Sequence, residues 1–187
     1  MLKPVWKFLR RRSKSLESST LPPAIESQLA GIEPSTSGNV RQYPCLVTLR
    51  DGSILDHVCL VEHASYLRVW GVEPADDPGK EWVRICDVIS VTESPSRLPA
   101  QFANQLYGIG ESGMGYMVFT VVFSDGSRQA YLTGGLVDFI DYPPLRGPKD
   151  VIDVLPHVGR DANPLHGPKC YWCIYEVKNL EWKTARS

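Results

Sequence analysis

The sequence contains no uninterrupted apolar run close to the roughly 20 residues that a transmembrane helix requires. Its first twelve residues mix Val5, Trp6, Phe8 and Leu9 with lysines and arginines. They therefore lack the apolar stretch of about 7–15 residues that follows the charges of a secretory signal. These absences predict a cytoplasmic protein that neither spans a membrane nor is exported.

The signature motifs of common enzymes are also missing. The chain has no Gly-x-Ser-x-Gly elbow, no His-Glu-x-x-His pair and no phosphate-binding loop that ends in Gly-Lys-Ser or Gly-Lys-Thr. Their absence does not exclude an enzyme, but it favours a protein without catalytic activity.

Neither sign of charge dominates, since 20 lysines and arginines face 21 aspartates and glutamates. Residues 1–40 hold six basic and three acidic side chains, whereas the remainder holds 14 basic and 18 acidic ones. An acidic surface repels a phosphate backbone, so nucleic-acid binding by the folded part is disfavoured.

Cysteine is sparse and odd in number, with five residues at positions 45, 59, 86, 170 and 173. A disulfide framework belongs to exported chains, so free thiols are expected here. Cys45, Cys59 and Cys86 lie in apolar runs, which predicts that these three are buried.

Residues 1–40 are rich in serine and proline and show little hydrophobic periodicity. This composition predicts a basic leader followed by a flexible arm. A short helix over residues 24–30 fits within the arm, because prolines precede it and Gly31 follows it. Residues 41–178 are expected to form a single β-rich domain, and residues 179–187 a frayed tail.

The turn Asp51-Gly52 separates two β-favouring segments, residues 45–50 and 53–61, and predicts a β-hairpin. Further strands of a first meander are expected at residues 66–70, 82–85 and 88–91. This repeated strand–turn–strand arrangement resembles the small SH3-type barrels over residues 43–92. The resemblance concerns architecture alone and transfers no functional residue.

A second hairpin is predicted around Asp125-Gly126, from residues 116–123 and 128–132. Helices are expected before and after it, at residues 99–107 and 148–155, with a last strand at 171–177. The predicted fold is α+β and mainly antiparallel, a small partly open barrel or sandwich of two hairpin halves (43–92 and 99–178) with one or two short helices. Turn chemistry alone explains why Asp-Gly-Ser occurs twice, so a duplication of the halves stays open.

Residues Gly108–Gly115 have the glycine spacing of a dinucleotide-binding loop. Such a loop needs a strand before it and a helix after it, so that the first amides of the helix face the pyrophosphate. The predicted order here is the reverse, a helix and then a strand. We therefore expect a helix cap and a flexible connection, which can still form the mobile edge of a binding site.

A zinc site can be drawn from two imidazoles and two thiols, those of His157, His166, Cys170 and Cys173. On a regular strand, however, two cysteines three residues apart point to opposite faces. Packing is therefore the preferred interpretation of the cysteine pair. A zinc-dependent or acid-catalysed hydrolase centred on residues 138–173 remains the alternative, with candidate acids at Asp138, Asp141, Asp150 and Asp153, each of which turn formation or helix capping also explains.

The function expected first is a protein-interaction module whose partner is another protein. Its basis is a strand-rich core with several aromatic residues that look exposed, namely Trp70, Trp82, Tyr107, Tyr142 and Trp172. Aromatic side chains anchor protein interfaces because they bury a large area at low entropic cost. A third possibility is peripheral attachment to an anionic membrane surface through residues 1–14, as a basic amphipathic helix that carries Trp6.

Overall fold

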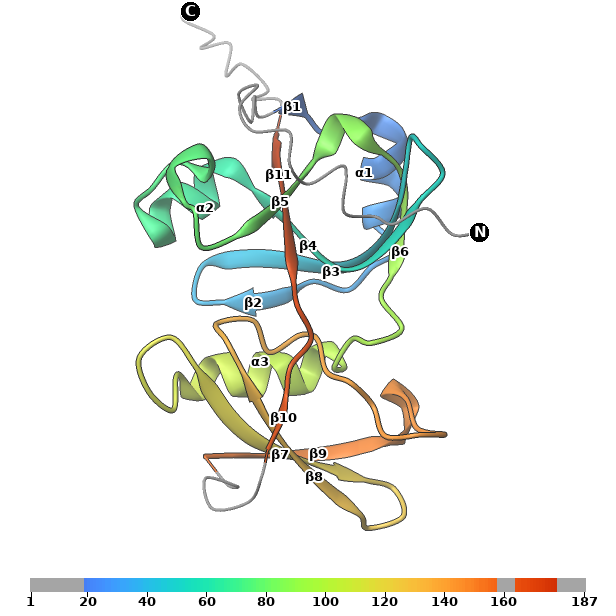
Figure 1. Ribbon diagram of the computed structural model, residues 1–187, viewed down its shortest axis with the longest axis vertical. Coiled ribbons are helices and arrows are strands. Elements are labelled where there is room, and N and C mark those ends of the chain that lie inside the picture. Colours follow the sequence, from blue (N-terminus) through green and yellow to red (C-terminus); the bar gives the residue numbers. More distant parts are fainter. Residues whose placement is uncertain (1–18, 158–163, 178–187) are drawn as a thin grey trace, which may run out of the picture.

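The computed structural model describes residues 19–157 and 164–177. Its strands form two sheets, one of seven strands and one of four. The seven-stranded sheet occupies the upper half of Figure 1 and the four-stranded sheet the lower half. The fold is α+β and mostly antiparallel, which confirms the predicted class.

Both predicted hairpins are present. The first joins β3 (Val40–Leu49) to β4 (Ile54–Glu62), and the second joins β7 (Met117–Phe123) to β8 (Arg128–Thr133). In each turn the aspartate Oδ1 accepts a 2.9 Å hydrogen bond from the amide two residues later. Gly52 and Gly126 have φ values of 82° and 83°, a conformation that explains why glycine follows aspartate in both turns.

In the upper sheet, β11 (Tyr171–Glu176) pairs in parallel with the central strand β4 on one side. On its other side it pairs with β5 (Glu81–Arg84) and β1 (Ser19–Thr20), while β6 (Val88–Glu93) and β2 (Ser35–Ser37) lie along β3. Only the 3-10 turn η3 (Ile85–Asp87) separates β5 from β6. The sheet therefore curls strongly without closing into a barrel.

Both faces of the upper sheet are buried at its centre, over residues 58–61 of β4 and 172–175 of β11, which explains the continuous apolar runs there. Alternate residues of β4 and β11 face the helix α1 (Pro23–Leu29) and join the first core cluster; they include Val58, Leu60 and Cys173. The residues between them face the helix α2 (His63–Trp70) and a segment of the lower half; they include Cys59, Val61 and Trp172. This second face joins the two halves.

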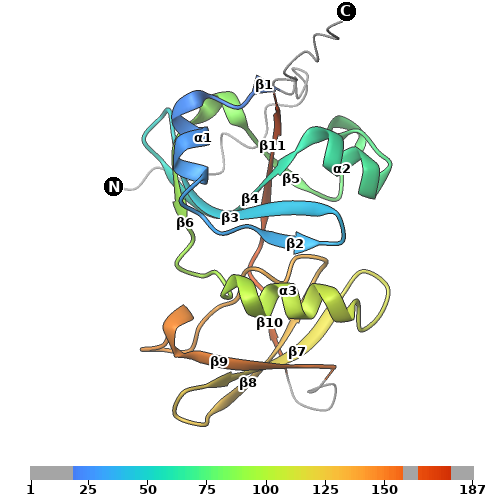
Figure 2. The same ribbon diagram turned by 180° about the vertical axis from the view of Figure 1, so that it is seen from behind.

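In the lower half, the helix α3 (Ala100–Ile109) lies over a sheet of order β10-β8-β7-β9, as Figures 1 and 2 show. Here β9 spans Val151–Pro156 and β10 spans Leu165–His166. Phe102 and Leu106 of the helix are buried with Phe119 and Val121 of the sheet. The predicted helix before the second hairpin is confirmed, as are the strands β5, β6 and β11.

Two predicted elements are wrong. Residues 66–70 belong to a helix rather than a strand, because the chain turns away from the sheet after β4 and Gly71 ends the helix with a φ of 65°. Residues 151–155 form a strand rather than a helix, and only Pro148–Asp150 make a 3-10 turn, η4. Pairing with β7 and the β-branched Val151 and Val154 outweigh the helix-start signal of Pro148.

The expected flexible arm is also corrected for residues 19–40. Its helix forms as predicted, but Ile25, Leu29 and Ile32 are buried in the upper core. The side chain of Gln28 accepts a 2.7 Å hydrogen bond from the amide of Val91. Apolar burial therefore holds this segment against the sheet. The expected leader before residue 19, with its membrane-binding residues 1–14, and the expected tail at 179–187 lie outside the described residues.

Candidate functional site

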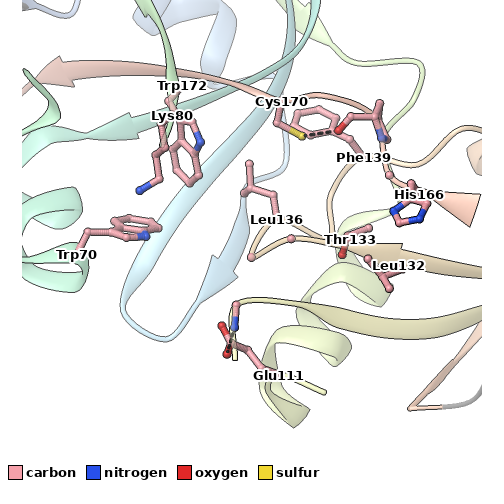
Figure 3. Close-up of a pocket in the computed structure, with 15 residues that line it drawn as sticks. Trp70, Lys80, Glu111, Leu132, Thr133, Leu136, Phe139, His166, Cys170 and Trp172 are labelled. Atoms are coloured by element: carbon pink, nitrogen blue, oxygen red, sulfur yellow. Dashed lines mark hydrogen bonds between the residues drawn. The ribbon is translucent and has the colours of Figure 1, made fainter. Parts of the chain in front are cut away.

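A cavity of about 470 Å³ opens where the two halves of the protein meet. We call it the cleft; it is bounded by α2 with the loop before β5, the loop after α3, the segment after β8 and the segment between β10 and β11. Figure 3 shows Trp70, Lys80 and Trp172 at one end and Thr133 and His166 at the other. Its size lies within the range of about 300–1,000 Å³ typical of ligand sites.

Three packed rings lie at the first end; Trp70 and Trp172 line the cleft, and the buried Tyr66 supports them from behind. The ring centroids of Tyr66 and Trp70 are 4.6 Å apart in a stacked pair, and the ring of Trp172 meets Trp70 edge-on at 5.1 Å. The ammonium nitrogen of Lys80 lies 4.6, 4.8 and 5.1 Å from the centroids of Trp70, Tyr66 and Trp172. These distances are those of cation–π contacts, so Lys80 and the rings stabilise one another.

Asp77 forms an ion pair with Lys80. Its Oδ2 lies 2.7 Å from the lysine Nζ and also accepts a 2.7 Å hydrogen bond from the hydroxyl of Tyr66. The hydrogen bonds from Lys80 and Tyr66 lower the pKa of the Asp77 carboxyl, whereas burial and then Asp77 raise the pKa of the Tyr66 hydroxyl. Lys80 is therefore held within the wall by an ion pair with Asp77 and by its contacts with the rings.

The opposite end is built around Thr133, the last residue of β8. Its side chain is buried, and its Oγ1 has no hydrogen-bond partner within the described residues. A Cβ atom on Gly167 would lie 2.9 Å from the Thr133 Cγ2, so this approach requires glycine. The two segments thus meet tightly at the edge of the cleft and diverge beyond it.

The loop at residues 110–115 borders the mouth of the cleft with Glu111 and Gly115. Glu111 accepts a 2.9 Å hydrogen bond from the amide of Gly115, which folds the loop on itself. Next to Gly115, the side chain of Met114 is 98% exposed. The loop follows a helix and precedes a strand, as predicted, and this order is opposite to that of a dinucleotide-binding loop.

Two titratable groups at or behind the lining of the cleft have raised pKa values. Burial, followed by the charge of Asp138, raises the pKa of the Cys170 thiol to about 12, so the nucleophilic thiolate is suppressed. Asp138 is fully buried behind the cleft, where it accepts a hydrogen bond from the Tyr107 hydroxyl, and burial raises its pKa. Among the described lining residues, no acid and base share a hydrogen bond.

The four residues of the candidate zinc site are distributed over different surroundings. His166 and Cys170 line the cleft, Cys173 lies in the inner core of the upper sheet, and His157 is exposed at the end of β9. Within residues 19–157 and 164–177, no three His, Cys, Asp or Glu side chains are grouped so that they could hold a metal ion. The structure therefore gives the zinc alternative no geometric support.

The candidate acids have separate local roles. Asp150 accepts a 2.8 Å hydrogen bond from the amide of Gly147, and Asp153 accepts one of the same length from Val154. Asp138 is buried with Tyr107, and Asp141 accepts the Tyr131 hydroxyl through its main-chain oxygen. Turn formation and main-chain bonding thus account for three of these residues, and none lines the cleft.

The five aromatic residues that looked exposed are not. Trp172 is 7% exposed and the other four, Trp70, Trp82, Tyr107 and Tyr142, are half-buried, because they pack where helices and loops cover the sheets. Only Trp70 and Trp172 reach the cleft. Lys80 and Thr133 were not identified from the sequence as residues of the cleft. The one sequence signal for this site was the Gly134-Gly135 pair after a predicted strand.

All five cysteines are free, as expected. Cys45 and Cys59 are buried, but the prediction for Cys86 is wrong. This residue lies in the 3-10 turn η3 at the surface, where its main-chain oxygen accepts a 2.6 Å hydrogen bond from Arg50.

Comparison of the chain with known protein families, with curated proteins and with solved structures gives no match. No helix among the described residues has the length and apolar character needed to cross a bilayer.

Proposed function

We propose that this protein is a non-catalytic interaction module that binds a segment of another protein in the cleft. The observation that carries the proposal is an indole-walled cavity bordered by a loop with a fully exposed methionine. Trp70 and Trp172 supply a rigid apolar wall, and Met114 supplies an adaptable contact at its rim. An exposed apolar side chain beside a cavity walled by two indole rings is typical of a surface that a partner covers.

The electrostatics of the cleft support the same function. Asp77 is already ion-paired with Lys80, and the raised pKa of the Cys170 thiol suppresses its reactive thiolate. The lining thus offers shape, apolar area and a few polar groups, which are the requirements of recognition.

Co-purification from extracts of the source cells tests the proposal with the tagged full-length chain as bait. Trp70→Ala removes the wall, and Met114→Glu places a charge at the rim on a side chain that does not support the core. Removal of an interface anchor costs more than about 1 kcal/mol of binding free energy. The amount of the partner recovered should therefore decrease at least about fivefold with both variants.

Ile152→Ala is the matched control, because Ile152 is 55% exposed on β9, the strand farthest from β10 in the lower sheet. The Ile152→Ala variant should recover as much partner as the wild type does. Thermal unfolding of each variant shows whether weaker recovery comes from a lost contact or from a loss of folding. Equal recovery by all three variants, or no specific partner with the wild-type chain, would contradict the proposal.

A further inference from the structure

The edge of β8 is only partly covered. The strand β10 pairs with Tyr131 and Leu132, and the amide of Gly167 donates to the Leu132 oxygen at 2.9 Å. After this bond the chain leaves the edge and enters β11 of the other sheet. The cleft is therefore a gap between a strand end and the segment that has just separated from it.

Main-chain polar groups line this gap. Gly134 and Gly135 are exposed, and their amides and carbonyls form no hydrogen bond with any described residue. Neither glycine has a neighbour within 4 Å of the position of a Cβ atom. The two glycines form a bend directly after β8, and a second main chain can approach their exposed backbone closely.

The hydroxyl of Thr133 is a second polar group at this edge that lacks a hydrogen-bond partner among the described residues. The residue is 3% exposed, lines the cleft and leaves Oγ1 unpartnered within the described part of the chain. A buried hydroxyl without a partner costs about 1–3 kcal/mol, and an amide or carbonyl of a ligand at this edge would satisfy it.

We propose that the cleft binds its partner as an extended peptide segment, which pairs through its main chain with Gly134 and Gly135 beyond the end of β10. This inference rests on the proposed function and specifies its partner as a linear segment rather than a folded surface. One side chain of the segment enters the space between Trp70 and Leu136, which Figure 3 shows facing the same cavity. Main-chain pairing gives the affinity and the side-chain pocket gives the selectivity, as in other strand-addition complexes.

A random linear peptide library selected on the full-length chain supplies the probe. The peptide of highest affinity that loses binding with Trp70→Ala is then synthesised with single N-methyl groups along its main chain. Loss of one hydrogen bond corresponds to about a tenfold change in affinity. We expect about tenfold weaker binding at alternate N-methylated positions, since alternate amides of a strand face the same edge.

On the protein, Gly135→Pro removes the amide donor, and Ile152→Ala on β9, outside the lining of the cleft, is the control. The proline variant should bind about tenfold more weakly while the Ile152→Ala variant binds like the wild type, with folding checked by thermal unfolding. If the proline variant does not fold, the N-methyl scan of the peptide still tests whether main-chain hydrogen bonds contribute to binding.

The outcomes separate the two proposals. A peptide that needs Trp70 but tolerates every N-methyl group would overturn main-chain pairing and leave the interaction function in place. If no selected peptide needs Trp70, the strand-addition inference is rejected; if co-purified partners are also insensitive to Trp70→Ala, the proposed function is rejected with it.

Discussion

The ammonium nitrogen of Lys80 lies 4.6 Å from the centroid of the Trp70 ring. The lysine precedes β5 and the tryptophan ends α2, so this contact joins two segments that both border the cleft. Asp77 completes the arrangement with a 2.7 Å ion pair to the same nitrogen. The wall of the proposed binding site is thus supported by a lysine whose nitrogen contacts both the rings and Asp77.

Lys80→Met should destabilise the fold by about 1–2 kcal/mol, because it removes the cation–π contacts and leaves Asp77 without its partner. Urea unfolding at neutral pH measures this change in the free energy of unfolding. The control is Lys169→Met, which breaks an ion pair with Glu81 on a 63% exposed side chain. Its effect should be clearly smaller, and equal losses would show that the rings do not stabilise Lys80.

Asp138→Asn should change how stability depends on pH. Burial raises the pKa of the Asp138 carboxyl in the folded protein above its ordinary value of 3.8. The resulting stability is fully present below that ordinary value and is lost as the pH rises through the folded pKa. Asparagine stays neutral at every pH. As the pH increases, the wild type should therefore lose stability relative to the variant, so the free energy of unfolding of the variant minus that of the wild type should rise. Parallel unfolding curves against pH would contradict the raised pKa.

Gly167→Ala should destabilise the protein by about 1–3 kcal/mol, because the new Cβ would lie 2.9 Å from the Thr133 Cγ2 in a closely packed site. Gly135→Ala is the matched control, since no atom lies within 4 Å of its Cβ position. Thermal unfolding compares the two variants. Similar melting temperatures would mean that the contact between Gly167 and β8 is looser than described.

One thiol should react with a maleimide in the native protein at neutral pH, that of the exposed Cys86. Burial raises the pKa values of Cys45 and Cys170 to about 12, and those of Cys59 and Cys173 also rise. Mass spectrometry should detect a single label, absent in Cys86→Ser, and five labels after denaturation. Rapid native labelling of Cys170 would show that the back of the cleft opens to solvent.

Local chemistry explains what the sequence could predict. The Asp-Gly turns determine their hairpins within a few residues, and Gly71 could have marked the helix end that was missed. The missed helix contains Tyr66, Val69 and Trp70, residues that favour strands when considered alone. Its tertiary surroundings decide otherwise, since Tyr66 is buried and Val69 is 53% exposed.

The cleft could not be predicted because its walls come from distant parts of the chain. The parallel pairing of β11 with β4 brings Trp172 beside Cys59, more than a hundred residues away in the sequence. Glycine spacing suggested that the loop at 110–115 forms a binding edge. Nothing local indicated that Lys80 and Thr133 lie at opposite ends of the cleft. Pairing between strands that are distant in the sequence has little signature in the local sequence of either strand.

Hydrogen exchange of the full-length protein with and without its co-purified partner tests the central claim most directly. The account predicts slower exchange of backbone amides at residues 110–116 and 132–136, with little change in α1 and β9. Protection confined to α1, β9 or other surfaces, with the cleft unchanged, would contradict it.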